Sequence, residues 1–381
     1  MTNLFQELLQ VSVGCQSASG NLSRVPSAEE WADLYRMAKE HTLIGVCFAA
    51  LQKLPSEQLA EMPQQLKMHW LGMAVQIQKR NELMNRRCVE LQRMLEQSSF
   101  RTYIMKGQGN AALYNNNVQN SENVCENKEF DLSSLRQPGD IDIYLEGGYD
   151  RVMGYVNKTF PTKEVNELEI HYHCFKDTEV EIHYQPFVMD GPKNKVLQQF
   201  FKEESEACFK NRISLGNSGD ICVPTITFNL VHQLVHIHHH LFYEGIGLRQ
   251  LMDYYFLLIK ASDSSVDSIE RSKKVIHQLG LDRFAAALMY VLQIVFGLER
   301  DRMLWCPSEK DGIFLLNEIM RSGNFGQSDI RKKGIYQNKL KSFWFVHFKT
   351  FCYWRFDHWA WFWSPICRIR GFIWRKLNGY N

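Results

Sequence analysis

Two carboxylates separated by a single residue, Asp140 and Asp142, lie in an apolar segment that follows Gly139. In an extended strand, alternate side chains point to the same face, so both carboxylates are expected on one side of a sheet. At ~4 Å and an effective dielectric constant near 20, two such charges repel by roughly 4 kcal/mol. A divalent cation turns this repulsion into attraction, because carboxylate oxygens are ligands that Mg²⁺ prefers. A solvated strand end is the alternative for so short a motif.

A third acidic residue, Glu181, lies in a second apolar segment at 180–182. If the two segments are neighbouring strands, Glu181 lies beside the aspartate pair. Three carboxylates clamp one or two Mg²⁺ (or Mn²⁺) ions, which align a triphosphate and activate an attacking hydroxyl. Gly139 lets the backbone approach a ligand closely. Upstream, the strand-to-turn sequence Lys106-Gly107 is placed as a phosphate-cradling turn would be.

Three further side chains are candidates for substrate contact, each with a structural alternative. Lys106 is suited to neutralising phosphate oxygens, or to ending a strand as a surface lysine. Arg136, four residues before Asp140, is suited to reaching a phosphate or orienting a carboxylate, or to a loop edge. His183 lies two residues after Glu181 and so shares its strand face. There it suits a general base, a proton shuttle or a hydrogen-bonding partner of the carboxylates.

A histidine-rich segment farther along the chain is predicted to be a helix that borders the substrate cleft. His232 and His236 are four residues apart, as in the HExxH motif of zinc proteases, but Gln233 replaces the glutamate that serves as the base there. A zinc protease is therefore not favoured. Arg249 and Asp253 are also four apart, which fits an i,i+4 ion pair worth ~0.3–0.5 kcal/mol.

Hydrophobic periodicity predicts the elements that position these residues. Residues 1–100 have helical patterns, with a capping box at Ser27 and Glu30 and a long helix opened by Pro63. Short β-branched and aromatic segments predict strands at 100–106 and 138–148 and a β-hairpin over 167–187. Short helices are expected at 108–114 and 151–160, a polar loop or insertion at 115–135, and successive helices from about 191.

Bulk composition excludes several classes of protein. Lysine and arginine number 44 against 42 aspartates and glutamates, a net charge of +2 that gives no reason to expect nucleic acid. The ten cysteines form no CxxC pair, so a zinc knuckle is not expected and the thiols are expected to be reduced. The first residues lack the pattern of a signal peptide, and no run of 18 apolar residues exists. A cytoplasmic protein is the expectation.

The C-terminal segment, 341–381, has a composition of its own. It contains six of the nine tryptophans, and Asp357 is its only acidic residue. Its basic residues are Lys341, Lys349, Arg355, Arg368, Arg370, Arg375 and Lys376. Aromatic and basic residues together suit peripheral contact with the inner face of a membrane. Packing against the body of the protein or a partner is the alternative, and single-stranded nucleic acid is less favoured.

Four sequence words carry a resemblance to a known family: MKGQGNAALY, RQPGDIDIYL, VEIHYQP and GLRQLMDYY, within about 103–255. With them the chain resembles the polymerase-beta-like nucleotidyltransferase superfamily, and within it an uncharacterised bacterial nucleotidyltransferase-like family often found with surface-polysaccharide genes. It departs from the usual Gly-Ser or Gly-Gly turn, which here is Lys106-Gly107 with Gly109 nearby. The segment 115–135 also lengthens the gap to Asp140.

The resemblance implies an α+β fold, with a small mixed β-sheet nucleotidyltransferase core flanked by N- and C-terminal helical regions. Accordingly we expect an N-terminal helical region at 1–100, the catalytic core at 101–190, a helical domain closing the cleft at 191–340 and an aromatic-basic tail at 341–381. The residues that the resemblance places at the site are Asp140, Asp142 and Glu181 as catalytic metal ligands, and Lys106, Gly107, Arg136, Gly139, His183 and Arg249 as substrate-binding residues. It also implies that Arg249 and Asp253 face the core.

The expected reaction is Mg²⁺-dependent transfer of a nucleotidyl group from a nucleoside triphosphate such as ATP to an unknown hydroxyl or phosphate acceptor. The acceptor is a sugar, a lipid-linked molecule or a protein, and a role in surface-polysaccharide biosynthesis rests on the resemblance. One alternative is a non-catalytic module that binds a nucleotide or a partner on the same fold. Another is an enzyme that attaches AMP to a partner protein, for which the same site would serve.

Overall fold

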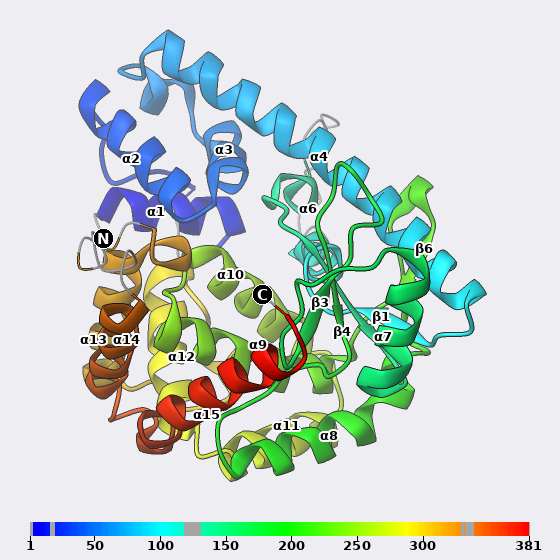
Figure 1. Cartoon of the computed structure of the whole chain (residues 1–381). Helices are drawn as coiled ribbons and strands as arrows, with labels where there is room; N and C mark the ends of the chain where they lie inside the picture. Colours follow the sequence, from blue (N-terminus) through cyan, green and yellow to red (C-terminus); the bar gives the residue numbers. More distant parts are fainter. Residues whose placement is uncertain are drawn as a thin grey trace.

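The computed structural model describes residues 3–15, 20–117, 131–327, 329, 331 and 339–380. It contains a four-stranded mixed sheet that lies to one side of the helices of the C-terminal half (Figure 1). Its strands are β1 (Thr102–Ile104), β2 (Ile141–Leu145), β3 (Glu169–His171) and β4 (Val180–His183), in the order β1-β2-β4-β3. Strands β2 and β4 are parallel, whereas β1 and β3 are antiparallel to their neighbours. The predicted mixed sheet and the β3–β4 hairpin are confirmed.

The register of the two central strands decides which side chains meet. Asp142 of β2 is directly opposite Glu181 of β4, and the flanking pair Ile143 and Ile182 is buried. Apolar residues next to each carboxylate fix this register, since a slip by one residue would move them to the wrong face. The two acidic segments, about forty residues apart in sequence, are therefore neighbouring strands, as predicted.

Helices precede and follow the sheet strands along the chain, and some of them pack against the sheet. The helices before and within the sheet region are α1 (Asn3–Val13), α2 (Ala28–Glu40), α3 (Ile44–Lys53), α4 (Gln64–Gln97), α5 (Gln108–Ala111), α6 (Leu132–Leu135) and α7 (Gly148–Thr159). Apolar side chains of α4 and α7 pack with the sheet strands in one buried cluster. The capping box is confirmed, because the Ser27 side chain accepts from the Glu30 amide and Glu30 accepts from the Ser27 amide.

The second half of the chain is mostly helical, as predicted. Its helices are α8 (Lys193–Cys208), α9 (Ile226–Tyr243), α10 (Leu248–Ala261), α11 (Val266–Gln278), α12 (Asp282–Phe296), α13 (Glu309–Ser322), α14 (Lys339–Cys352) and α15 (His358–Leu377). Helix α1 packs against α12 within one large buried cluster, and the Gln10 side chain donates to the Ile294 carbonyl at 3.0 Å. The first helix thus shares its core with the C-terminal half. Domain boundaries at 100, 190 and 340 stay a prediction.

The segment after α8 is a local departure from the predicted run of helices. Strands β5 (Arg212–Ser214) and β6 (Asp220–Cys222) form a two-stranded hairpin there. Gly216 and Gly219 in its turn have φ values of 61° and 116°, a region of backbone conformation that glycine tolerates best. The hairpin is anchored from α4, because the Gln92 side chain accepts a hydrogen bond from the Cys222 amide.

Short 3₁₀ turns connect the main elements: Ser56–Leu59, Ala112–Asn117, Gly216–Ser218, Arg300–Arg302 and Asn324–Gly326. Most of the predicted loop at 115–135, namely 118–130, lies outside the described residues.

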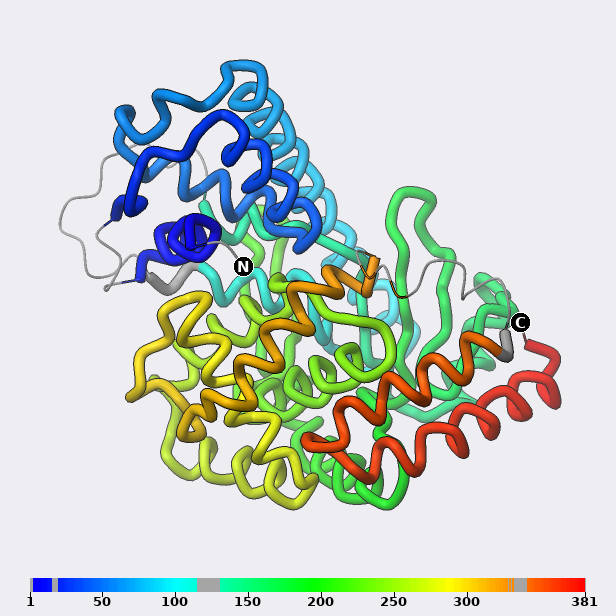
Figure 2. The backbone as a smooth tube through the Cα atoms, turned by 90° about the vertical axis from the view of Figure 1, so that its left-hand side faces the viewer, coloured from blue at the N-terminus to red at the C-terminus, as the bar shows by residue number. Residues whose placement is uncertain are grey.

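Helices α14 and α15 run side by side along one edge of the molecule (Figure 2). Within the described part of the chain, no helix has the length and apolarity that crossing a bilayer requires.

Candidate active site

Asp142 and Glu181 meet on one face of the sheet because their strands pair in parallel register. Oxygen atoms of these two carboxylates and a ring nitrogen of His183 lie within 4.8 Å of one another. Asp142 is only 3% exposed. Asp140 immediately precedes β2 and stands outside this tight group. The sheet therefore brings together three of the predicted residues and places the fourth at its edge.

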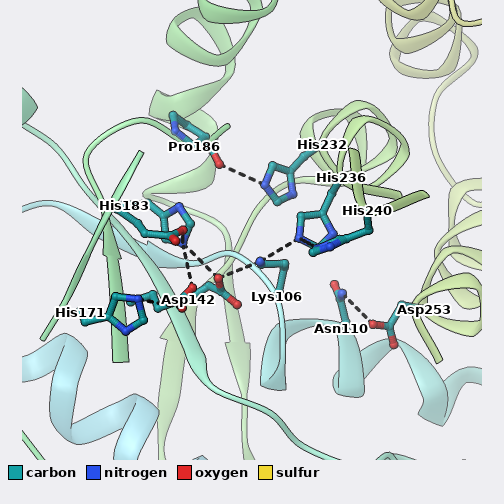
Figure 3. A network of polar contacts seen from close by, with 12 residues as sticks. Lys106, Asn110, Asp142, His171, His183, Pro186, His232, His236, His240 and Asp253 are labelled. Atoms are coloured by element: carbon teal, nitrogen blue, oxygen red, sulfur yellow. Dashed lines mark hydrogen bonds and ion pairs between the residues drawn. The ribbon is translucent and has the colours of Figure 1, made fainter. Parts of the chain in front are cut away.

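Two cationic or hydrogen-bonding side chains hold Asp142 in place. The Lys106 ammonium lies 2.7 Å from Oδ1 of Asp142, and it also donates to Nε2 of His236 at 3.0 Å. His183 donates from Nε2 to the same Asp142 oxygen at 3.0 Å (Figure 3). His183 thus shares the face of Glu181, as its spacing predicted, and orients the central carboxylate.

Crowding of like charges separates the pKa values of the carboxylates. Burial works to raise the pKa of Asp142, but Lys106 and the hydrogen bond from His183 outweigh it and hold that pKa well below its usual range. Burial and the neighbouring carboxylates, Asp142 first among them, raise the pKa of Glu181 to about 9. The charge of Asp142, followed by burial, also raises the pKa of Asp140. The site holds more negative charge than Lys106 alone balances.

A fourth carboxylate, Glu169 of β3, joins the site and was not among the predicted residues. It lies 3.5 Å from Nε2 of His183, and it forms a second close group with His171 and Glu181. The alternation of the 167–175 segment puts Glu169 and His171 on one face. Only the antiparallel pairing of β3 with β4, in which His171 is opposite Glu181, shows that this face is the one that carries Asp142 and Glu181.

Arg136 is bound to a carboxylate from the C-terminal helical region. Its Nε and Nη2 donate to the two oxygens of Asp253 on α10, each at 2.7 Å, and both side chains are buried. Tyr114 and Asn110 also donate to Asp253, at 2.7 and 3.3 Å. The alternative of an i,i+4 pair between Arg249 and Asp253 is wrong, because Arg136 occupies that carboxylate. The geometry favours a positioning role for Arg136 over direct phosphate contact.

This buried network positions the loop that leads into the aspartate motif. Asn81 of α4 donates to the Arg136 carbonyl at 2.8 Å, so α4 holds the main chain while α10 holds the side chain. Arg249 donates to the Gln137 carbonyl at 2.9 Å, and a Cβ placed on Gly139 would lie 3.8 Å from its Nη1. Both α10 residues therefore face the segment expected to form the catalytic core, as the resemblance implied.

The turn after β1 approaches the same loop from the other side. Gly107 has a φ of 60° in the region that favours glycine, and it is the N-cap of the short helix α5. A Cβ added at Gly107 would lie 3.4 Å from the Asp140 carbonyl oxygen. A larger residue would strain the turn because of this φ value, whereas its Cβ would make only ordinary contact with the Asp140 carbonyl. The glycine of the predicted phosphate turn therefore has a conformational reason here.

Helix α9 forms the opposite wall of a cavity of about 1100 Å³ that contains the carboxylates. The histidines of α9 that line it are His232, His236, His239 and His240. Burial is the main cause that lowers the pKa of His232 and of His239 to about 3, so these rings are neutral. His232 contacts the Pro186 carbonyl at 3.3 Å and belongs to neither of the two metal-capable groups. The predicted cleft-bordering helix is confirmed, and the zinc-protease alternative gains no support.

The donor set fits a hard divalent cation. Carboxylate oxygens of Asp142 and Glu181 face one another beside a third carboxylate, and oxygen ligands of this type suit Mg²⁺ or Mn²⁺. The raised pKa of Glu181 is the mark of charge repulsion that such a cation would relieve. His183 is engaged with Asp142 by a hydrogen bond, which fits an orienting residue better than a ligand.

Comparison with known proteins gives one finding. A family model described as an uncharacterised nucleotidyltransferase matches the chain over residues 27–118 and 127–297. The match runs from α2 to α12 and includes both aspartates of the motif and Glu181, whereas α14 and α15 lie beyond its end. No curated protein matches the chain.

Proposed function

Because the chain belongs to this uncharacterised nucleotidyltransferase family, we propose that it transfers a nucleotidyl group from a nucleoside triphosphate to a hydroxyl or phosphate acceptor. In this proposal Asp140, Asp142 and Glu181 hold Mg²⁺ or Mn²⁺. The observation that supports it most is the parallel register that sets Asp142 opposite Glu181 in a cavity next to Lys106. The nucleotide, the acceptor and a role in surface-polysaccharide assembly are parts of the proposal.

The chain's own residues divide the work of this reaction. A bound divalent cation supplies charge stabilisation at the phosphates and lowers the pKa of the attacking hydroxyl. Lys106 meets the triphosphate as a point charge, and the backbone at Gly107 and Gly139 lets the phosphates approach closely. Arg249, whose guanidinium lies beside Gly139, adds positive charge at the same loop. His183 keeps the Asp142 carboxylate in its orientation.

The bonds exchanged follow from the chemistry of phosphoryl transfer. The acceptor oxygen forms a bond to the α-phosphorus, the bond from that phosphorus to the bridging oxygen breaks, and pyrophosphate leaves. Glu181, in its ionised form, takes the proton of the acceptor hydroxyl. The contacts of Glu181 are suited to this task, because it lies between the buried Asp142 and the partly exposed Glu169 and is itself partly exposed.

Incubation of the protein with each α-labelled nucleoside triphosphate, Mg²⁺ and a cell extract tests the proposal. We expect one nucleotide to transfer its label to an extract component in the presence of the wild-type chain and not of Asp142→Asn. Label on protein would identify the enzyme as one that modifies partners with a nucleotide. Nucleotide binding without any transfer would show the non-catalytic alternative and overturn the proposal.

Glu181→Gln is expected to lower turnover by about two orders of magnitude with little change in affinity for the triphosphate, the pattern of an interaction made in the transition state. Glu179→Gln is the matched control, because Glu179 immediately precedes β4 and is exposed. Steady-state kinetics with the labelled nucleotide measures both. Wild-type turnover in Glu181→Gln, or a loss in Glu179→Gln alone, would move the third acid to another position.

Glu181→Gln is also expected to stabilise the metal-free fold at neutral pH. Folding raises the pKa of Glu181 from 4.5 to about 9, so its contribution to stability is fully present below pH 4.5 and is lost as pH rises toward 9. Glutamine is neutral throughout this range, and we expect it to gain a few kcal/mol at most near pH 7.5. Thermal unfolding in chelator at pH 5 and pH 7.5 measures the difference. An equal melting temperature for both proteins at pH 7.5 would contradict it.

A further inference from the structure

The α14–α15 hairpin exposes a continuous apolar face. On α14 the exposed residues are Trp344, Phe348 and Phe351, in the turn that follows it Trp354, and on α15 they are Trp359, Phe362, Ile366, Ile369, Phe372, Ile373 and Leu377. Their spacing of three or four residues puts the residues of each helix on one side of it. Phe348 is 65% exposed and Phe362 is 52% exposed. The two helices run side by side at the edge of the molecule (Figure 2). The two stripes are joined where Phe351 and Trp354 contact Trp361 of α15, with ring centroids 5.7 and 5.3 Å apart.

The opposite side of the α14–α15 hairpin packs against the rest of the protein, so the hairpin is a fixed part of the fold. Tyr353, Phe356 and Ala360 are buried in the main apolar core. Tyr353 donates to Oε2 of Glu318 at 2.9 Å, and Arg370 pairs with Glu167 at 3.2 Å. The alternative that the tail packs on the body is therefore true of one side only. The other side consists of large apolar residues that a soluble surface seldom shows together.

Charge decides which partner fits this face. Residues 341–376 contain seven basic residues and a single acidic one, Asp357. Asp357 is buried and pairs with Lys193 at 3.0 Å. Of the basic residues, Lys349 is buried, and Arg355 and Arg370 pair with Asp311 and Glu167 outside the segment. The positive charge at the surface of the hairpin therefore rests mainly on residues such as Arg375 and Lys376. A second copy of the chain docked through the same face would bring two positively charged surfaces together. Anionic lipid headgroups complement the charge, and the acyl region accepts the tryptophan and phenylalanine side chains.

We propose that the α14–α15 hairpin docks on the surface of an anionic lipid bilayer, with its apolar face in the headgroup layer. Helix α15 also borders the cavity that contains the carboxylates, through Arg368, Ile369, Arg370 and Phe372. Ile369 and Phe372 belong to the exposed face as well, so the face continues into the cavity. Docking therefore places the cavity next to the lipid surface. Docking of the hairpin on a bilayer does not depend on the proposed transfer reaction.

Sedimentation with vesicles tests the proposal on the full-length protein. We expect the wild type to bind phosphatidylcholine vesicles only when they contain phosphatidylglycerol. Binding should weaken as salt shortens the Debye length from ~10 Å at 0.1 M to ~3 Å at 1 M. The combined variant Phe348→Ser, Phe351→Ser, Phe362→Ser and Ile366→Ser should lose roughly two orders of magnitude in partitioning. Arg375→Gln with Lys376→Gln should lose about fivefold for each cation removed.

The matched control carries Met68→Ser and Val266→Ser, two exposed apolar residues on α4 and α11 that are 55% and 76% exposed. It should bind like the wild type. Because variants can misfold, quenching of tryptophan fluorescence by brominated lipid in the unaltered protein provides a second measurement, and we expect quenching that salt reverses. Equal sedimentation of wild type and the four-residue variant would overturn the proposal. So would absence of quenching, or a wild-type dimer in solution that the variant converts to monomer without any vesicle binding.

Discussion

Asp142→Asn and Asp140→Asn are each expected to abolish Mg²⁺ or Mn²⁺ binding and to lower nucleotidyl transfer by about three orders of magnitude or more. Metal-ion stabilisation of the transition state is worth several kcal/mol, and each ~1.4 kcal/mol corresponds to a factor of ten in rate. Asp142 faces Glu181 across paired strands, so its loss removes a central oxygen donor. Asp140 lies just ahead of β2, where it adds charge to the same loop.

Calorimetric titration with Mn²⁺, with and without the triphosphate, measures the metal, and the labelled-nucleotide assay measures turnover. We expect metal affinity to rise with triphosphate in the wild type, because phosphate oxygens complete the coordination. Asparagine keeps the shape of aspartate, so circular dichroism should stay native. Unchanged metal binding in both variants would remove the basis for the site, whatever the turnover.

Asp253→Asn is expected to destabilise the protein by about 3–5 kcal/mol, because it leaves the buried Arg136 guanidinium without its countercharge. Arg136 donates twice to Asp253 and both side chains are less than one-tenth exposed. Arg136 also depresses the pKa of Asp253 against the effect of burial, so the carboxylate is ionised in the folded state. The same change should lower activity, since Arg136 leads into the loop of Asp140.

Denaturant unfolding measures this loss, and two controls define it. Glu146→Gln removes a partner of the exposed Arg101 and should cost no more than ~1 kcal/mol. The double variant Arg136→Met and Asp253→Leu removes both charges and should recover much of the stability, because a matched apolar pair avoids the stranded charge. If Asp253→Asn and Glu146→Gln unfold at the same denaturant concentration, the buried network does not hold the loop.

The spacing of residues along the sequence was enough to predict which side chains share one face of a strand or helix. One-residue separation put Asp140 and Asp142 on a common face, and the two-residue step from Glu181 placed His183 on its face, because strand side chains alternate. Apolar flanks marked β2 and β4 as strands, and the Ser27 and Glu30 pattern marked the start of α2. Chemical type then favoured a metal site, since close carboxylates at neutral pH need a cation.

Only the tertiary structure decided which of these faces meet. Pairing of β2 with β4 joins segments about forty residues apart, and the choice of Arg136 rather than Arg249 as the partner of Asp253 joins residues 117 apart. Glu169 reaches the site through the pairing of β3, and Lys106 contacts His236 on a helix from the other half of the chain. Such contacts depend on how whole elements bury their apolar surface together. Spacing along the chain determines on which face of its strand or helix a side chain lies. Packing of the core determines which side chains from distant segments it contacts.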